Sequence, residues 1–171
     1  MSKLRISGVV DDSIVDGRGL RYTVFTQGCP HHCPGCHNPQ THDFAGGHLV
    51  EIDDLLAEIC ENPMLRGVTF SGGEPFCQPA PLAELAEKIH AVPGRKLDVT
   101  VFSGYTWEEL EAMDDPDVAA LLRQTDILID GPFLAAEKDL TLLFRGSRNQ
   151  RILDMAKTRA AGKAVAAAWA E

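Results

Sequence analysis

The segment "LRYTVFTQGCPHHCPGCHNP" (residues 20–39) joins a predicted strand to a loop that is rich in cysteine and histidine. Residues 20–26 contain several β-branched and aromatic side chains, which favour a strand. The eight residues from Cys29 to Cys36 then hold three cysteines with the spacing C-x3-C-x2-C. Three thiols this close together can hold a zinc ion, hold an iron–sulfur cluster, or simply pack against one another.

Outward from this segment, strand-like and helix-like patterns alternate. Strands are predicted at 67–71, 96–103 and 126–130, with a candidate fifth strand at 151–154. Helices are predicted at 51–60, 80–92, 106–113 and 116–125. This alternation indicates an α/β fold with a parallel sheet. The Ala-rich segment 155–171 is predicted as a C-terminal helix or tail that docks through Val165 and Trp169.

Glycine-rich or polar clusters follow the predicted strands. The cysteine loop follows the first strand, and "SGGEP" (71–75), "SGY" (103–105) and "DGPF" (130–133) follow the next three. In parallel α/β folds, ligands bind at the edge where the carboxyl ends of the strands meet. We therefore expect one binding site, built from these four loops.

Composition limits the classes of function. The chain has 171 residues, 44% of them apolar, and no composition break that would mark a second domain. A net charge of −9 disfavours a nucleic-acid binder. The sequence shows neither a signal-peptide pattern nor an apolar stretch of roughly 18 residues, so we expect a cytoplasmic protein with no membrane partner. Reduced thiols there make the five cysteines better candidates for ligands than for disulfides.

The number of thiols separates the kinds of metal site. A structural zinc site needs a fourth ligand, which His31, His32 or His37 could supply. A ferredoxin-type cluster needs four cysteines, but Cys60 and Cys77 are isolated in the sequence. Three thiolates on a four-iron cube would leave one iron open for chemistry, by analogy with catalytic zinc. A zinc-binding module and a small iron–sulfur electron carrier remain alternatives at this point.

The cysteine loop together with "SGGEP" resembles the radical S-adenosylmethionine enzymes. The resemblance implies a parallel-stranded, incomplete and open TIM-like barrel, one [4Fe–4S] cluster per chain, and S-adenosylmethionine at its fourth iron. Residue by residue, it implies Cys29, Cys33 and Cys36 as iron ligands, Gly72, Gly73 and Glu74 beside the methionine moiety, and Gly35, Cys36 and His37 beside the adenine. Gly35 stands where this superfamily often has an aromatic residue.

The segment 16–39 further resembles the glycyl-radical activating enzymes. "FSGYTWEEL" (102–110), "DILIDGPF" (126–133) and "LLFRGSRNQRILD" (142–154) are similar to the activating proteins of anaerobic ribonucleotide reductases. The resemblance implies a single radical S-adenosylmethionine domain over 1–171, with its core at about 4–154. It implies that flavodoxin or a similar donor supplies an electron, and that a 5′-deoxyadenosyl radical takes hydrogen from a glycine of the partner reductase. An activase of the pyruvate formate-lyase type is the alternative.

Other polar residues have weaker assignments. Ser103 is a candidate for a ribose contact, although a helix-capping serine is the commoner role. Asp130 is expected to open a turn, and Thr106 with Glu109 to form a capping box. Arg145, Arg148 and Arg151 form either a solvated face or a docking patch for the reductase.

Three assignments concern cysteine and histidine residues outside the ligand set. His31 and His32 are expected to be exposed rather than to act as ligands. Cys60 ends an apolar helical stripe and is expected to be a buried packing thiol. Cys77 is expected near the site but not as a fourth ligand, because that would close the open iron.

Overall fold

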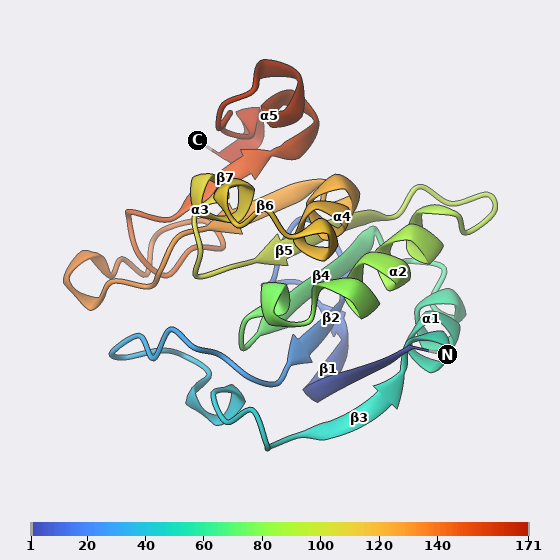
Figure 1. Cartoon of the computed structure of the whole chain (residues 1–171). Helices are drawn as coiled ribbons and strands as arrows, with labels where there is room; N and C mark the ends of the chain where they lie inside the picture. Colours follow the sequence, from blue (N-terminus) through green and yellow to red (C-terminus); the bar gives the residue numbers. More distant parts are fainter. Residues whose placement is uncertain (1, 171) are drawn as a thin grey trace.

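The computed structural model describes residues 2–170, and a seven-stranded sheet forms its centre (Figure 1). The strands lie in the order β3-β1-β2-β4-β5-β6-β7. Their bounds are β1 Lys3–Ser13, β2 Arg21–Thr26, β3 His48–Glu51, β4 Gly67–Gly72, β5 Asp98–Phe102, β6 Ile127–Asp130 and β7 Arg151–Asp154. Because the order starts at β3 and ends at β7, the sheet is open rather than closed on itself.

The four central strands are parallel, as the sequence predicted, but the outer strands are not. β2, β4, β5 and β6 pair in parallel. β1 runs antiparallel to β2 and β3, and β7 runs antiparallel to β6. The connections 14–20 and 131–150 contain no α-helix, whereas parallel neighbours need a long crossover, usually helical. The sheet is therefore mixed, and the sequence patterns missed β1 and β3.

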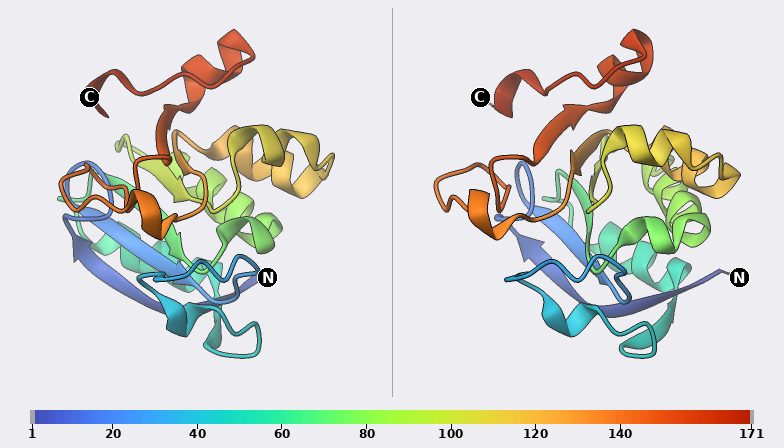
Figure 2. Two further views of the ribbon diagram at one scale, coloured as in Figure 1. Left: turned by 90° about the vertical axis from the view of Figure 1, so that its left-hand side faces the viewer. Right: turned by 60° about the vertical axis from the view of Figure 1, so that its left-hand side comes forward.

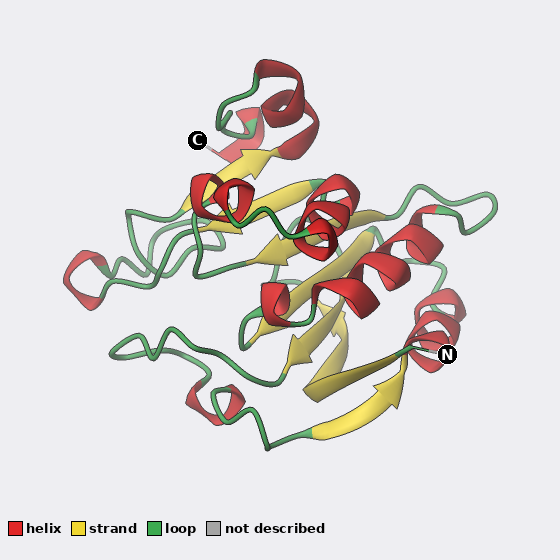
Figure 3. Ribbon diagram, in the orientation of Figure 1, coloured by secondary structure: helices red, strands yellow, loops and turns green. Residues whose placement is uncertain are grey.

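Helices cover one face of the sheet (Figure 3). Their bounds are α1 Ile52–Glu61, α2 Pro79–His90, α3 Trp107–Ala112 and α4 Pro116–Gln124, with α5 Met155–Ala161 beyond β7. The spacing of Leu82, Leu85 and Ile89 places all three on the buried side of α2. They belong to one core cluster with Val68 and Val99, which alternate toward the same face of their strands. The main hydrophobic core therefore lies between the sheet and the helices.

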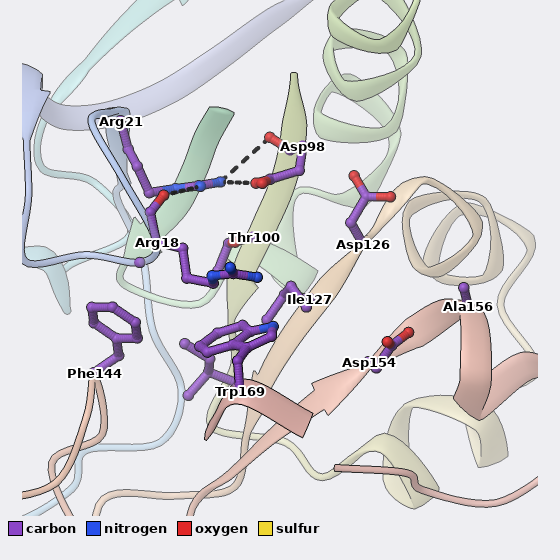
Figure 4. Close-up of a pocket in the computed structure, with 12 residues that line it drawn as sticks. Arg18, Arg21, Asp98, Thr100, Asp126, Ile127, Phe144, Asp154, Ala156 and Trp169 are labelled. Atoms are coloured by element: carbon purple, nitrogen blue, oxygen red, sulfur yellow. Dashed lines mark hydrogen bonds and ion pairs between the residues drawn. The ribbon is translucent and has the colours of Figure 1, made fainter. Parts of the chain in front are cut away.

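The opposite face of the sheet carries buried polar residues. Arg21 is fully buried there, although arginine rarely is. Its guanidinium donates to the hydroxyl of Thr69 at 2.7 Å and to the carbonyl oxygen of Val68 at 3.0 Å. It also pairs with the carboxylate of Asp98 (Figure 4). These partners compensate the arginine for its lost hydration and fix β2, β4 and β5 side by side.

Replacing Asp98 with alanine is expected to lower the free energy of unfolding by about 2 kcal/mol. Removing one partner of a fully buried ion pair costs more, but the Asp98 side chain is 32% exposed and solvent screens it in part. Urea denaturation measures the change. Asp98→Asn is the control, because its amide oxygen still accepts from Arg21 and should preserve part of the stability. Equal stability of wild type and Asp98→Ala would contradict this account.

The C-terminal segment, expected as a helix or tail, is a short helix followed by an extended stretch. α5 ends at Ala161 and is followed by Gly162, which adopts the left-handed conformation (φ 68°) that typically ends helices. The chain then runs extended along β7, where the amide of Ala167 donates to the carbonyl of Ile152 at 2.9 Å. This pairing satisfies an otherwise open sheet edge, which a continuous helix could not do. Trp169 packs against the cluster around Ile129, so the predicted docking through this tryptophan is confirmed.

Within residues 2–170, none of the helices combines the length and the apolarity needed to span a bilayer.

Candidate functional site

A cavity of about 540 Å³ lies at the carboxyl ends of the parallel strands. The loops after β2, β4, β5 and β6 all contribute to its wall, as the sequence predicted. The cysteine loop and the segment 131–150 project beyond the same end of the sheet (Figure 2). The volume is within the usual range for small-molecule sites. Its wall includes Cys29, Cys33, Cys36, Gly72 and Gly73.

One backbone hydrogen bond anchors the start of the cysteine loop, and another closes a turn at its end. The amide of Cys29 donates to the carbonyl of His42 at 3.2 Å, and that of Cys36 donates to the carbonyl of Cys33 at 3.1 Å. Cys29 is buried, whereas Cys33 and Cys36 are half-buried. All three cysteines line the same cavity, which is large enough for a group bigger than a single ion. This set of soft donors fits an iron–sulfur cube.

Burial raises the pKa of the Cys29 thiol, and the nearby negative groups of Glu74, Cys33 and Cys36 act in the same direction. The hydrogen bond from the backbone of His31 acts in the opposite direction. A bound cation would reverse this balance, because a metal ligates the thiolate and releases the proton. Within residues 2–170, no three side chains of His, Cys, Asp or Glu lie close enough together to hold a single metal ion.

The "SGGEP" segment is bonded directly to the start of the cysteine loop. The amide of Gly73 donates to the carbonyl of Thr26 at 2.9 Å, and that of Glu74 donates to the carbonyl of Gly28 at 2.8 Å. A Cβ atom at Gly73 would overlap the carbonyl oxygen of Gly28 and lie 2.9 Å from its carbon. Gly72 has a φ of 94°, a conformation that side chains disfavour. Both glycines are therefore required by the fold itself.

The carboxylate of Glu74 is fully buried and engaged inside the protein. It accepts hydrogen bonds from the amides of Phe76 at 3.0 Å and Gly104 at 2.7 Å. The hydroxyl of Ser103 donates to it at 2.9 Å and accepts from the amide of Tyr105. Ser103 lines the cavity, but its only proton is committed to Glu74. The structure therefore favours a positioning role for Ser103 over the ribose contact.

His31 is not exposed, so the prediction for this residue is wrong. Its side chain is 16% exposed, and its Nε2 lies 2.6 Å from a carboxylate oxygen of Glu74. The buried carboxylate explains the difference, because it draws the imidazole inward as a partner. Sequence spacing gave no signal for this contact, since 43 residues separate the two. His32 is exposed, as expected.

An aromatic ring that sequence reasoning did not assign lies beside the third cysteine. Phe133, from the loop after β6, lines the cavity and lies 5.2 Å from the ring of His37 between centroids. A Cβ atom at Gly35 would lie 3.5 Å from the ring of Phe133. Gly35, which has a φ of 76°, thus leaves room for an aromatic residue supplied by another loop. The motif "DGPF", which contains Phe133, was visible in the sequence, but its proximity to Gly35 was not.

The three arginines of the predicted docking patch have separate surroundings, which corrects that hypothesis. Arg151 pairs with the buried carboxylate of Asp130 and with Glu108. Arg145 lines the cavity, and within residues 2–170 its buried Nε has no hydrogen-bond partner. Only Arg148 is exposed and remains a docking candidate. Because the segment folds back on itself, residues three apart in sequence point to different environments.

Asp130 does more than open a turn. Its carboxylate also accepts the amide of Trp107 at 2.7 Å, which fixes the first turn of α3 to the end of β6.

The two remaining cysteines lie outside the cavity wall. Cys60 is exposed, so the prediction of a buried packing thiol is wrong. It follows the buried Ile59, and one residue further along a helix turns the side chain away from the core. Cys77 is also exposed, yet the surrounding protein desolvates its thiol and raises its pKa to about 11, with Glu74 and Cys29 adding to the effect.

A second cavity, of about 360 Å³, lies on the polar face of the sheet (Figure 4). Trp169 of the C-terminal segment lines it, and the guanidinium of Arg18 lies 4.6 Å from the centre of its ring. Phe144 lines both cavities and meets Trp169 edge to face. The C-terminal segment therefore forms one wall of this cavity.

Comparison with known proteins agrees with the geometry. Residues 15–153 match the family model described as "4Fe-4S single cluster domain". The anaerobic ribonucleoside-triphosphate reductase-activating protein of Vibrio cholerae is 36% identical over 81% of this chain and 90% of its own length. The protein of the same name from Escherichia coli K12 is 35% identical over 80% of this chain and 90% of its own length. The one from Enterobacteria phage T4 is 31% identical over 81% of this chain and 86% of its own length.

Among solved structures, QueE from Escherichia coli has a TM-score of 0.44 and 19% identity, over 61% of this chain and 54% of that chain, a likeness too weak to carry an argument. The sequence relatives are decisive, because they match most of this chain and most of their own. The chain belongs to the family of anaerobic ribonucleoside-triphosphate reductase-activating proteins.

Proposed function

We propose that this protein cleaves S-adenosylmethionine reductively at a [4Fe–4S] cluster and thereby installs a glycyl radical on an anaerobic ribonucleotide reductase. The observation that carries this proposal is the set of three thiols facing one 540 Å³ cavity, in a chain whose relatives are named as activating proteins of that reductase. A fourth thiol does not line the cavity within residues 2–170.

The protein is a single radical S-adenosylmethionine domain, an incomplete TIM-like barrel with its core at about 4–154. In support, the central strands are parallel, the sheet is open, and the cavity lies at the carboxyl ends of the strands. An open side suits a substrate that is a glycine in another protein, because that segment of backbone must reach the cavity.

In this proposal Cys29, Cys33 and Cys36 ligate three irons. The backbone of Gly72 and Gly73 forms the wall beside the methionine moiety, where a side chain would intrude. Glu74 acts indirectly: its carboxylate is fully buried and holds the loops that form this wall.

The remaining groups of S-adenosylmethionine have candidate partners on the opposite wall. The backbone of Gly35, Cys36 and His37 meets the adenine, and Phe133 offers the aromatic surface that Gly35 lacks. Arg145 is the candidate for the methionine carboxylate, because it is a cation in the cavity wall with an unsatisfied buried Nε among residues 2–170. A guanidinium recognises a carboxylate well because it can donate two parallel hydrogen bonds.

When bound, the cluster supplies the electron that breaks the C5′–S bond and gives methionine and a 5′-deoxyadenosyl radical, which takes hydrogen from the glycine. The protein's own residues hold the sulfonium compound beside the open iron and shield it within the cavity. Flavodoxin or a similar donor, a cytoplasmic location and no interaction with nucleic acid belong to the same proposal. The free cysteines support a cytoplasmic location, because thiols stay reduced there. The net charge of −9 disfavours a nucleic-acid partner.

Anaerobic incubation of the reconstituted protein with the reductase, S-adenosylmethionine and a reductant is expected to produce a glycyl doublet in electron paramagnetic resonance. The same mixture with a pyruvate formate-lyase in place of the reductase is expected to give none. A doublet only on the formate-lyase would overturn the choice of partner. Metal analysis of the reconstituted protein is expected to find iron and sulfide near four each per chain. A colourless protein with one zinc per chain would favour a zinc-binding module instead.

A brown protein that never cleaves S-adenosylmethionine under strong reductant would favour an electron carrier.

A further inference from the structure

The buried carboxylate of Glu74 is the meeting point of three loops. One oxygen accepts the amide of Gly104 at 2.7 Å and faces Nε2 of His31 at 2.6 Å. The other accepts the amide of Phe76 at 3.0 Å and the hydroxyl of Ser103 at 2.9 Å. A fully buried carboxylate needs such a set of donors, since each missing partner leaves an uncompensated polar group. The loops after β2, β4 and β5 are thus joined at one side chain.

His31 is the contribution of the cysteine loop to this junction. It lies between Cys29 and Cys33, and within residues 2–170 no backbone hydrogen bond joins residues 30–33 to the sheet. The chain turns directly after it, because His32 has a φ of 49°. The imidazole therefore provides the polar connection between this four-residue stretch and the body of the protein.

The surroundings of His31 are shaped to receive its ring. A Cβ atom at Gly104 would lie 2.6 Å from Nε2 and would overlap Cδ2 of the imidazole. The ring of Tyr105 packs against it edge to face, with 4.5 Å between centroids. Opposite an ionised carboxylate, which only accepts hydrogen bonds, Nε2 has to carry a proton and donate it. Gly104 and Tyr105 thus form a fitted slot for His31.

We propose that the His31–Glu74 pair is a clamp that holds the Cys29–Cys33 segment in its ligand-presenting conformation before the cluster is built. The inference rests on the proposed function, because it assigns His31 a positioning role toward the three thiols. It differs from the methionine-side role that the family resemblance implies for Glu74. Groups that orient metal ligands typically change metal affinity about 10-fold to 100-fold when they are removed.

The first test compares two neighbouring histidines in the reconstituted protein. His31→Ala is expected to speed chelator-driven iron release by about 10-fold or more. The control is His32→Asn at an exposed position, which should behave like wild type because asparagine tolerates the φ of 49° found there. His31→Gln should recover much of the loss, because its amide nitrogen can take the place of Nε2. His31→Asn should not, since its amide nitrogen falls short of Glu74. Wild-type release from both His31→Ala and His31→Asn would overturn the clamp.

A second variant tests the clamp without altering His31. Gly104→Ala is expected to displace the imidazole and to speed iron release in the wild-type background. In the His31→Ala background the same change should have little further effect, because no ring remains to be displaced. This non-additivity is the signature of a direct interaction. Additive effects of the two changes would overturn the contact.

The clamp can also be measured in the absence of iron, which separates it from the proposed function. In the cluster-free protein, His31→Ala is expected to raise hydrogen exchange at the amides of Cys29 and Gly104, while His32→Asn leaves both at wild-type rates. Circular dichroism checks that each variant is folded. Unchanged exchange in His31→Ala would refute the clamp even if the wild type generates the glycyl radical. Increased exchange would support it even if the wild type carries no cluster.

Discussion

Cys33→Ala is expected to lose the intact cluster and, with it, cleavage of S-adenosylmethionine. Cys33 lines the cavity from the centre of the C-x3-C-x2-C spacing, and only two thiols would remain in the wall. A four-iron cube held by two protein ligands has two irons without thiolate, so the cube should fall apart during reconstitution. Iron content is expected to fall from near four per chain to well below that value, and 5′-deoxyadenosine formation to background.

The control is Cys60→Ala. Cys60 is exposed at the end of α1 and does not line the cavity, so its loss should leave iron content unchanged. The pair of variants separates a missing ligand from the general loss of a reactive thiol. Wild-type iron, sulfide and cleavage rates in Cys33→Ala would contradict the ligand assignment. Cluster loss in Cys60→Ala would point to a different ligand set.

Gly73→Ala is expected to lower the free energy of unfolding of the cluster-free protein by about 3 kcal/mol. A methyl group at this position would meet the backbone of Gly28, with 2.9 Å to its carbonyl carbon and 3.0 Å to its nitrogen. Backbone atoms cannot rotate away as a flexible side chain can. The substitution would therefore push "SGGEP" away from the cysteine loop and weaken the hydrogen bonds that join the two segments.

Urea denaturation of the cluster-free protein measures this effect without any ligand present. Gly8→Ala is the matched control, because a Cβ atom at Gly8 would meet no atom within 4 Å. It is expected to be neutral or slightly stabilising, since alanine loses less backbone entropy on folding. If Gly73→Ala were as stable as Gly8→Ala, the glycine would be needed only for ligand binding and not for the fold.

Local sequence patterns predicted the elements whose stability depends on their own residues. The period of apolar side chains in α1, α2 and α4 was sufficient, because each helix buries a single stripe. The capping box of Thr106 and Glu109 is confirmed at the start of α3, since both members lie within one turn. Strand direction was harder: β7 was found by its apolar residues, but the non-helical connection 131–150 decides that it runs antiparallel.

Unlike the exposure of Cys60, three other departures from expectation share one physical cause, which is competition from partners that are distant in sequence. His31 was expected in solvent, but a buried carboxylate 43 residues away draws it inward. The C-terminal segment was expected as a helix or tail, and the open edge of β7 offers hydrogen bonds that its extended part satisfies. Phe133 had no assignment, because only the folded loops bring it beside Gly35.

By itself, the sequence determined that strands alternate with helices, that four unusual loops follow parallel strands, and that three closely spaced thiols stand in the first of them. These features depend on residues that are near one another along the chain. The tertiary structure alone decided which sheet edges run antiparallel, that Arg151 serves Asp130 rather than a docking patch, and that His31 and Ser103 converge on Glu74. The reason is that a buried charge recruits whichever donors the fold brings to it, and that choice is made in space, not along the chain.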